Sequence, residues 1–254
     1  HGQGAAGDFV RKLVQALRQH VEKVTDDYEI VEAAIHTGSR VVQIHGPVIL
    51  DEINEYIQKA IPVVREFPNE SFWVRHESVF GFGLDLLNVT DTVTAVRFLE
   101  AALPYAESGI MDRAFIDANP VRYNFRDEEN PPQLLPVEFS VEDAIQFMEK
   151  GYDLVAKYDG IKSGKWGEVT GESAFYQGIR NLKGRGSAEA SLDFLERCFP
   201  LVEQWEEIRP EEGFSGPDWL HYVAEESEEV GFDTVLEYRG EIIPFAAKGH
   251  PHHV

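Results

Sequence analysis

The sequence has little cysteine, few basic residues and no long apolar run, and each shortage excludes something. Its 254 residues include one cysteine, Cys198, which excludes an intramolecular disulfide and a thiolate-rich metal cluster. Apolar runs such as 61–64 fall far short of the roughly 20 residues that a membrane-spanning helix needs. No basic leader followed by an apolar stretch opens the chain. We therefore expect a soluble protein of the reducing cytoplasm that makes no membrane contact.

Basic residues are outnumbered, with 23 lysines and arginines against 45 aspartates and glutamates, for a net charge of −22. The electrostatic field of so negative a surface repels the phosphate backbones of nucleic acids, so the composition argues against direct nucleic-acid binding. Three interpretations of the charge remain: adaptation to a salty cytoplasm, attraction of a basic partner, or mimicry of nucleic-acid charge. Much of the glutamate falls on predicted helices, where solvated helix faces are a simpler explanation.

The sequence repeats part of itself. A first segment contains Trp73, 77–80, Gly83, 98–100 and 103–104, and a second contains Trp166, 172–175, Gly178, 194–196 and 199–200. Phe80 and Phe175 are 95 residues apart, and Phe98 and Phe194 are 96 apart. Stacked repeats usually have periods of about 20 to 50 residues, so this longer period indicates a copied half-domain. We expect two similar substructures related by a pseudo-twofold axis.

The pattern of apolar and turn residues predicts an α+β fold dominated by helix, with duplication of a hairpin-plus-three-helix unit. Thr90 or Asp91 is expected to cap one helix, Ser78 another, and Ser140 with Asp143 forms a capping box. Predicted helices lie at 8–24, 50–64, from 78, from 92, 140–157, 173–182, 188–205 and 217–230. Predicted strands lie at 28–35, 40–44, 113–116, 121–125, 234–238 and 241–245. These hairpins can pair into one shared antiparallel sheet covered by helices.

The charged, proline-rich stretch 126–136 is the best linker candidate. We divide the chain there into a first half at 8–126 and a second at 137–247, either separate or fused into one domain. The glycine-rich residues 1–7 and the histidine-rich residues 248–254 are expected to be flexible ends.

One polar cluster inside the repeat combines an imidazole, a carboxylate and a cation near a predicted helix start. If the two halves face each other, Glu77 and Glu172 approach and form a carboxylate pair, with His76 as the base. These three residues are the candidate catalytic set. The alternative is that each glutamate stabilises the free amides of a helix N-terminus.

Aromatic residues at matched places of the repeat suggest a ligand pocket between the copies. Its candidate residues are Trp73, Arg75, Trp166 and Tyr176. The alternative is that such aromatics form the shared core. The glycine-rich stretch 160–166 lacks the spacing and the hydroxyl residue of a phosphate loop. We predict no cofactor and no metal site.

The preferred hypothesis is an interaction protein, such as an inhibitor, immunity factor or regulator, that binds a basic surface of a partner protein. The first alternative is a hydrolase or metal-dependent enzyme that uses a carboxylate pair where the two copies meet. The second is a module that binds a small ligand. The pattern of residues leaves the identity of the partner and the oligomeric state open.

Overall fold

The computed structural model describes residues 11–12, 15, 28–66, 76–108, 118–124, 133–162, 174–208, 223 and 230–246. Helix dominates this part of the chain. The α-helices are α2 (Tyr28–His45), α3 (Leu50–Val64), α4 (His76–Leu86), α5 (Thr92–Glu107), α7 (Val141–Lys162), α8 (Ala174–Arg185), α9 (Ala188–Ile208) and α11 (Phe232–Ala246). A short 3-10 helix, η1 (Pro47–Ile49), and two strands, β1 (Tyr123–Asn124) and β2 (Gln133–Leu134), complete the described elements.

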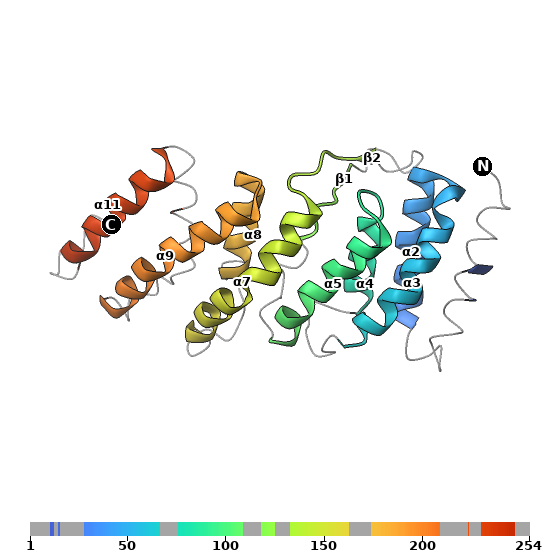
Figure 1. Ribbon diagram of the computed structural model, residues 1–254, viewed down its shortest axis with the longest axis horizontal. Helices are drawn as coiled ribbons and strands as arrows, with labels where there is room; N and C mark the ends of the chain where they lie inside the picture. The colour runs from blue at the N-terminus through green and yellow to red at the C-terminus, as the bar shows by residue number, and fades with distance from the viewer. Residues whose placement is uncertain are drawn as a thin grey trace.

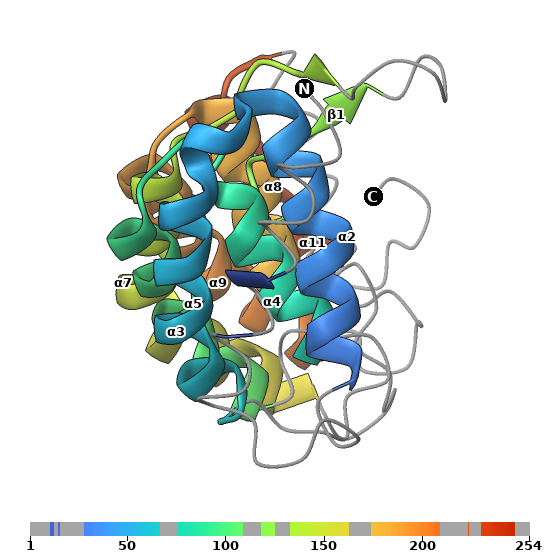
Figure 2. The ribbon, with the colours of Figure 1, turned by 90° about the vertical axis from the view of Figure 1, so that its right-hand side faces the viewer.

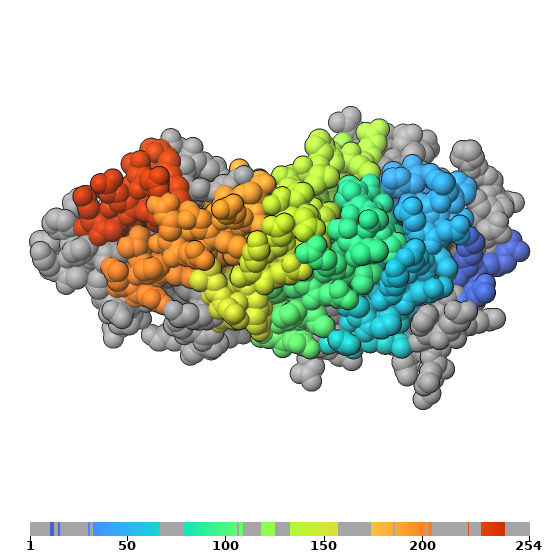
Figure 3. Space-filling view, in the orientation of Figure 1, coloured from blue at the N-terminus to red at the C-terminus, as the bar shows by residue number. Residues whose placement is uncertain are grey.

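The helices are stacked side by side along the long axis of the molecule (Figure 1). Helices α3, α5, α7, α9 and α11 pack on one another in that order and form what we call the helix row. Helices α2 and α4 pack together beside the row at one end, and α8 packs on α7 and α9 further along (Figure 2). In the space-filling view successive segments form bands from one end to the other (Figure 3). The result is an elongated array of helices.

Apolar residues on the inner faces of these helices form one continuous core. It runs from Ile30 in α2 to Leu236 in α11, and its largest fully buried side chains include Tyr56, Tyr105 and Phe147. The core continues across the predicted boundary between the halves, because α5 and α7 pack directly on each other. Cys198 is buried in it. Burial of aromatic and aliphatic surface therefore holds the array together along its length.

The five helices of the row share a residue pattern that is visible once their starts are aligned. They start at Leu50, Thr92, Val141, Ala188 and Phe232, so successive starts are 42, 49, 47 and 44 residues apart. The seventh place is aromatic in each: Tyr56, Phe98, Phe147, Phe194 and Tyr238. The thirteenth place is proline in four: Pro62, Pro104, Pro200 and Pro244. Helix α7 differs, since its thirteenth residue is Asp153.

Two glycines let aromatic side chains of the row approach neighbouring helices closely. A methyl group on Gly83 of α4 would overlap the Tyr56 ring, with Cζ only 2.9 Å away. A methyl group on Gly178 of α8 would overlap the Phe147 ring, with Cε2 2.7 Å away. The Tyr56 hydroxyl also donates a hydrogen bond of 2.8 Å to the carbonyl of Phe80. Gly83 and Gly178 hold matched places in the repeated segments, and both fit a ring against helix backbone.

The two repeated segments follow one another along the array. They fall on α4–α5 and on α8–α9, and α7 lies between α5 and α9 in the row (Figure 1). This serial order differs from the pseudo-twofold arrangement that we expected. The offset of 95 residues spans two successive steps of the helix row, each within the usual range for stacked repeats.

The predicted shared sheet is wrong for the described residues, where a single two-stranded sheet occurs. Strands β1 and β2 are antiparallel, with Tyr123 opposite Leu134 and Asn124 opposite Gln133. Strand β1 falls within the predicted strand 121–125, whereas β2 falls in the stretch that we interpreted as a linker. The predicted strand at 113–116 lies outside the described residues.

Both predicted hairpins near the ends of the chain are helices. Residues 28–45 form α2, which buries Ile30, Ala34 and Val41 along one helical stripe. Residues 232–246 form α11, which buries Phe232, Val235 and Leu236. The β-branched residues of these segments favoured strands, but their apolar spacing of three and four residues decides the outcome because it matches the face of a helix.

The predicted helix caps at Asp91 and Ser140 are confirmed. The amide of Thr94 donates 2.8 Å to Asp91 Oδ1, and the amide of Asp143 donates 3.0 Å to Ser140 Oγ. The prediction for Ser78 is wrong, since α4 already includes His76. Among the described helices, none is both long enough and apolar enough to cross a membrane.

Candidate functional site

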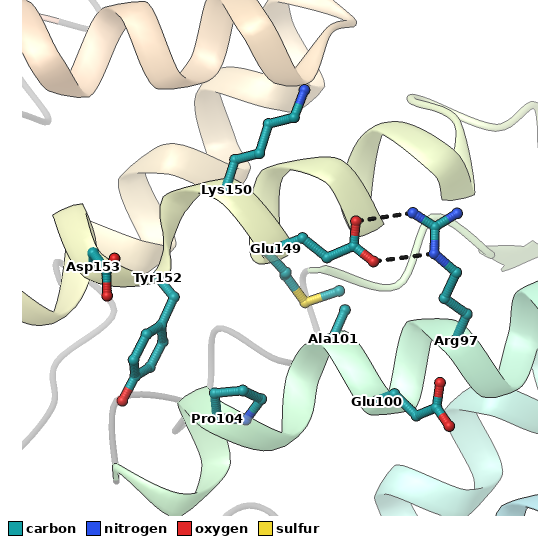
Figure 4. A pocket seen from close by; sticks show the side chains of 9 residues that line it. Arg97, Glu100, Ala101, Pro104, Glu149, Lys150, Tyr152 and Asp153 are labelled. Carbon is teal, nitrogen blue, oxygen red and sulfur yellow. Dashed lines mark hydrogen bonds and ion pairs between the residues drawn. The ribbon is translucent and has the colours of Figure 1, made fainter.

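A groove lies between α5 and α7, midway along the helix row (Figure 4). Its volume is about 370 Å³, within the range of small-ligand and side-chain sites. Nine residues line it: Arg97, Glu100, Ala101 and Pro104 of α5, and Met148, Glu149, Lys150, Tyr152 and Asp153 of α7. We call this the α5/α7 groove. It is formed by two consecutive helices of the row, which fix both of its walls.

The floor of the α5/α7 groove is apolar. Ala101, Pro104 and the buried Met148 contribute hydrocarbon and thioether surface between the two helices. Tyr152 is half-buried, and its ring meets the ring of Tyr105 edge to face at 5.1 Å. The Tyr105 hydroxyl donates 2.7 Å to the carbonyl of Met148, so α5 and α7 are tied directly beneath the floor. The floor is therefore a rigid surface.

Charged side chains surround that floor. Arg97 donates to Glu149 at 3.0 and 2.8 Å and to Glu142 at 3.0 and 3.1 Å. These hydrogen bonds raise the pKa of Arg97, so the guanidinium stays charged and engaged by two carboxylates. Glu100 and Asp153 are exposed and form no ion pair among the described residues. Arg97 and its two glutamates together carry one net negative charge.

Lys150 is the other basic residue of the lining. In Figure 4 its side chain extends away from Pro104 and Ala101, so its ammonium group does not point onto the floor. With two cations and four carboxylates, the groove and its ion cluster carry a net charge of −2. An anionic ligand meets repulsion here, whereas a cation with an apolar stem finds a complementary surface.

A second polar cluster joins β1 to α2 and α4. Arg40 donates to both carboxylate oxygens of Asp85 at 3.1 Å, and its guanidinium lies 4.5 Å from the centre of the Tyr123 ring. The Tyr123 hydroxyl donates 2.5 Å to Asp85, and the Asn88 amide donates 2.8 Å to the Tyr123 oxygen. His45 reaches Asn88 Oδ1 at 3.2 Å. The cluster is a set of internal ties that holds β1 against the helices.

Burial dominates the protonation equilibria in this cluster. Desolvation raises the pKa of the Asp85 carboxyl, while the Arg40 charge and the Tyr123 hydrogen bond oppose the rise. Desolvation also raises the pKa of the Tyr123 phenol, which the neighbouring Asp85 charge reinforces. The phenol therefore remains a hydrogen-bond donor at neutral pH. Most of its donors and acceptors pair within it, with Arg40 Nε as the buried atom left without a hydrogen bond among the described residues, so the cluster ties β1 to the helices and stabilises the fold.

The structure places few of the site residues that the sequence predicted. Trp73, Arg75, Trp166 and Glu172 lie outside the described residues. His76 and Glu77 begin α4, but their side chains are not among those described. Tyr176 is half-buried in α8 and packs against the core. The catalytic set and the aromatic pocket, and with them the enzyme and small-ligand hypotheses, stay predictions.

No protein-family model, no curated protein and no solved structure matches this chain.

The sequence reasoning missed the α5/α7 groove. Neither Glu100 nor Asp153 stands out in the sequence, because exposed carboxylates are common on acidic helices. The sequence feature that points to this groove is that α7 departs from the residue pattern of the other helices in the row. Where the other helices have proline after an aliphatic or phenylalanine residue, α7 has Tyr152 followed by Asp153. That comparison requires the alignment of helix starts, which the structure supplies.

Proposed function

We propose that this chain is an interaction protein whose acidic helix row binds a basic surface of another protein. The observation that carries the proposal is the regular placement of carboxylates along the row. Each helix has an exposed glutamate at its sixth or ninth place: Glu55, Glu100, Glu149, Glu196 and Glu237. These places are one turn apart on the same face of a helix. Equivalent places on helices stacked in one direction share a side of the array, so these glutamates form an acidic face.

We infer further that the row consists of five copies of one helix-pair unit of about 45 residues. The shared aromatic and proline places and the even spacing of helix starts support this inference. The matched fit of Gly83 on Tyr56 and of Gly178 on Phe147 supports it too. The repeat that is visible in the sequence is then two units long. Arrays of this kind present extended binding surfaces, because each added unit lengthens the same face.

Of the five glutamates, Glu55 pairs with Lys59 and Glu149 with Arg97, whereas the other three form no ion pair among the described residues and leave a surplus of negative charge on this face. Arg97 pairs with glutamates of α7, and Arg197 of α9 pairs with Asp233 of α11 at 2.5 Å. Each arginine also has a second carboxylate within reach, so neither has a charge to spare. The remaining carboxylates attract lysine and arginine side chains, and exposed pairs of this type weaken with salt.

The test is a salt titration of binding to a defined basic probe. A fluorescein-labelled 12-residue peptide of alternating arginine and glycine is titrated with the full chain at 50, 150 and 500 mM NaCl. We expect fluorescence anisotropy to report binding that falls steeply with salt, and no binding of the matched glutamate–glycine peptide. Absence of binding at 50 mM NaCl, or an affinity that salt does not change, contradicts the proposal.

A matched pair of variants locates the interaction. Glu196→Gln with Glu237→Gln removes two charges from the acidic face, whereas Glu66→Gln with Glu138→Gln removes two exposed charges elsewhere. Both variants change the net charge equally. We expect the first to weaken binding two- to threefold and the second to leave it nearly unchanged. Equal effects would show attraction by net charge alone, which contradicts a defined binding face.

A further inference from the structure

We propose that the α5/α7 groove seats one basic side chain of that partner, arginine in preference to lysine. The inference rests on the proposed function and names the place on the acidic face where a single residue of the partner is recognised. Three independent features of the groove carry it: its position in the row, its lining and its charge.

The α5/α7 groove lies at the helix that departs from the residue pattern of the row. Proline at the thirteenth place recurs in α3, α5, α9 and α11, whereas α7 has Asp153 there, preceded by Tyr152. Tyr152 and Asp153 both line the groove that Pro104 of α5 also lines, and in Figure 4 Tyr152 extends toward α5 whereas Asp153 lies at one end of the groove. In α7 an aspartate replaces the proline that the other four helices share, and this aspartate and the tyrosine before it line a cavity. Such a departure from a shared pattern is where we expect a functional site.

The lining suits a long side chain with a cationic end. The floor of Ala101, Pro104 and Met148 can cover the methylene stem of an arginine or lysine. Tyr152 offers a ring against which a flat guanidinium can stack. Asp153 and Glu100, both exposed and outside any ion pair among the described residues, can accept its hydrogen bonds. A planar guanidinium can stack on the Tyr152 ring and donate to the neighbouring Asp153 at once, which is why arginine is preferred over the compact ammonium of lysine.

The charge selects a cation over an anion. Arg97 is already engaged by Glu142 and Glu149, and Lys150 extends away from the floor in Figure 4. The described residues therefore direct no uncommitted cation onto the floor, while two carboxylates remain at its rim. An incoming guanidinium adds opposite charge to a site of net charge −2.

Met148 provides a direct reporter on the groove floor, because the chain contains only two methionines, Met111 and Met148. The full chain labelled at the methionine methyl groups gives two signals, which Met148→Leu assigns. We expect the Met148 signal to move saturably when the arginine–glycine peptide is added. The same peptide with citrulline in place of arginine keeps the shape without the charge, and it should leave the signal in place.

Variants separate the groove from the rest of the acidic face. Glu100→Gln with Asp153→Asn should weaken binding of the arginine peptide about tenfold at 150 mM NaCl, against two- to threefold for the Glu196→Gln, Glu237→Gln control. Tyr152→Leu should weaken the arginine peptide about threefold and a lysine–glycine peptide less. Thermal unfolding of each variant checks that the variant is folded. If a variant is not folded, the Met148 titration of the unaltered chain still tests whether the groove binds the peptide.

The outcomes distinguish this inference from the proposed function. If the chain binds neither basic peptide at 50 mM NaCl, the proposed function and this inference both fail. If the peptide binds but the Met148 signal stays in place, or the groove variant is no weaker than its control, the inference is overturned and the proposed function stands. A Met148 signal that moves equally with the citrulline peptide also overturns it, since charge is then not recognised.

Discussion

Replacing Gly178 by alanine tests the close fit between α7 and α8. The new methyl group would lie 2.7 Å from Cε2 of Phe147 and 3.1 Å from Cδ1 of Leu195, both in fully buried side chains. Overpacking of this kind costs about 1–3 kcal/mol. Alanine returns about 1 kcal/mol through its higher helix propensity. We therefore expect Gly178→Ala to lose up to about 2 kcal/mol of unfolding free energy.

The control for this prediction lies in the same helix. Gly184 of α8 has no atom within 4 Å of the place where its methyl group would be, so Gly184→Ala gains helix propensity without a clash. It should stabilise the chain by up to about 1 kcal/mol. Urea unfolding followed by circular dichroism at 222 nm measures both variants. A shift of 1 kcal/mol corresponds to about 2–4 °C in Tm for a chain of this size.

The two alanine variants should differ in stability, with Gly178→Ala less stable than Gly184→Ala. If Gly178→Ala is as stable as Gly184→Ala, the close approach of Phe147 to α8 is wrong and the packing between α7 and α8 differs from that described. Gly83→Ala gives an independent test, since its methyl group would meet the Tyr56 hydroxyl first. Tyr56→Phe should then recover part of the loss in a double-mutant cycle.

Two further predictions concern polar interactions. Asp91→Ala should cost about 1 kcal/mol by removing the cap of α5, and Asp91→Asn should restore most of it. The hydrogen bond from the Thr94 amide lowers the pKa of Asp91 in the folded chain, so the stabilisation by this carboxylate is complete well above the unfolded pKa of about 4 and is lost as the pH falls below it. The unaltered chain should therefore lose stability relative to Asp91→Asn as the pH is lowered. Asp85→Ala should cost about 3 kcal/mol in urea unfolding, because it leaves the largely buried Arg40 charge uncompensated. Tyr123→Phe, which removes one hydrogen bond to Asp85, should cost about 1 kcal/mol, and equal losses for the two variants would contradict an ion pair at the centre of the cluster.

Local signals in the sequence predicted local structure well. The caps at Asp91 and Ser140 depend on a hydroxyl or carboxylate three residues before a helical amide, a geometry that sequence spacing fixes. Segment 28–45 was mistaken for a hairpin because of its β-branched residues and the Thr37–Gly38–Ser39 stretch. Tertiary packing overrides both signals, since α4 covers the stripe of Ile30, Ala34 and Val41.

The residue pattern that the helices of the row share was only partly visible in the sequence. Two segments share the letters Phe-Leu-Glu, at 98–100 and 194–196, and a search for identity finds these first. In the other helices of the row the aromatic place is Tyr56, Phe147 or Tyr238, and the neighbouring residues differ. What these helices share is the spacing of an aromatic residue and, in four of the five, a proline, a pattern that a search for identity does not reveal. The α5/α7 groove could not be found from the sequence for the same reason.

The serial stacking of helices has a mechanical consequence. Each helix of the row packs on the next one along it. Small rotations at successive helix interfaces add up along such an array and change its curvature. A deformation applied at one end of the helix row is therefore expected to spread over several helix interfaces instead of breaking one.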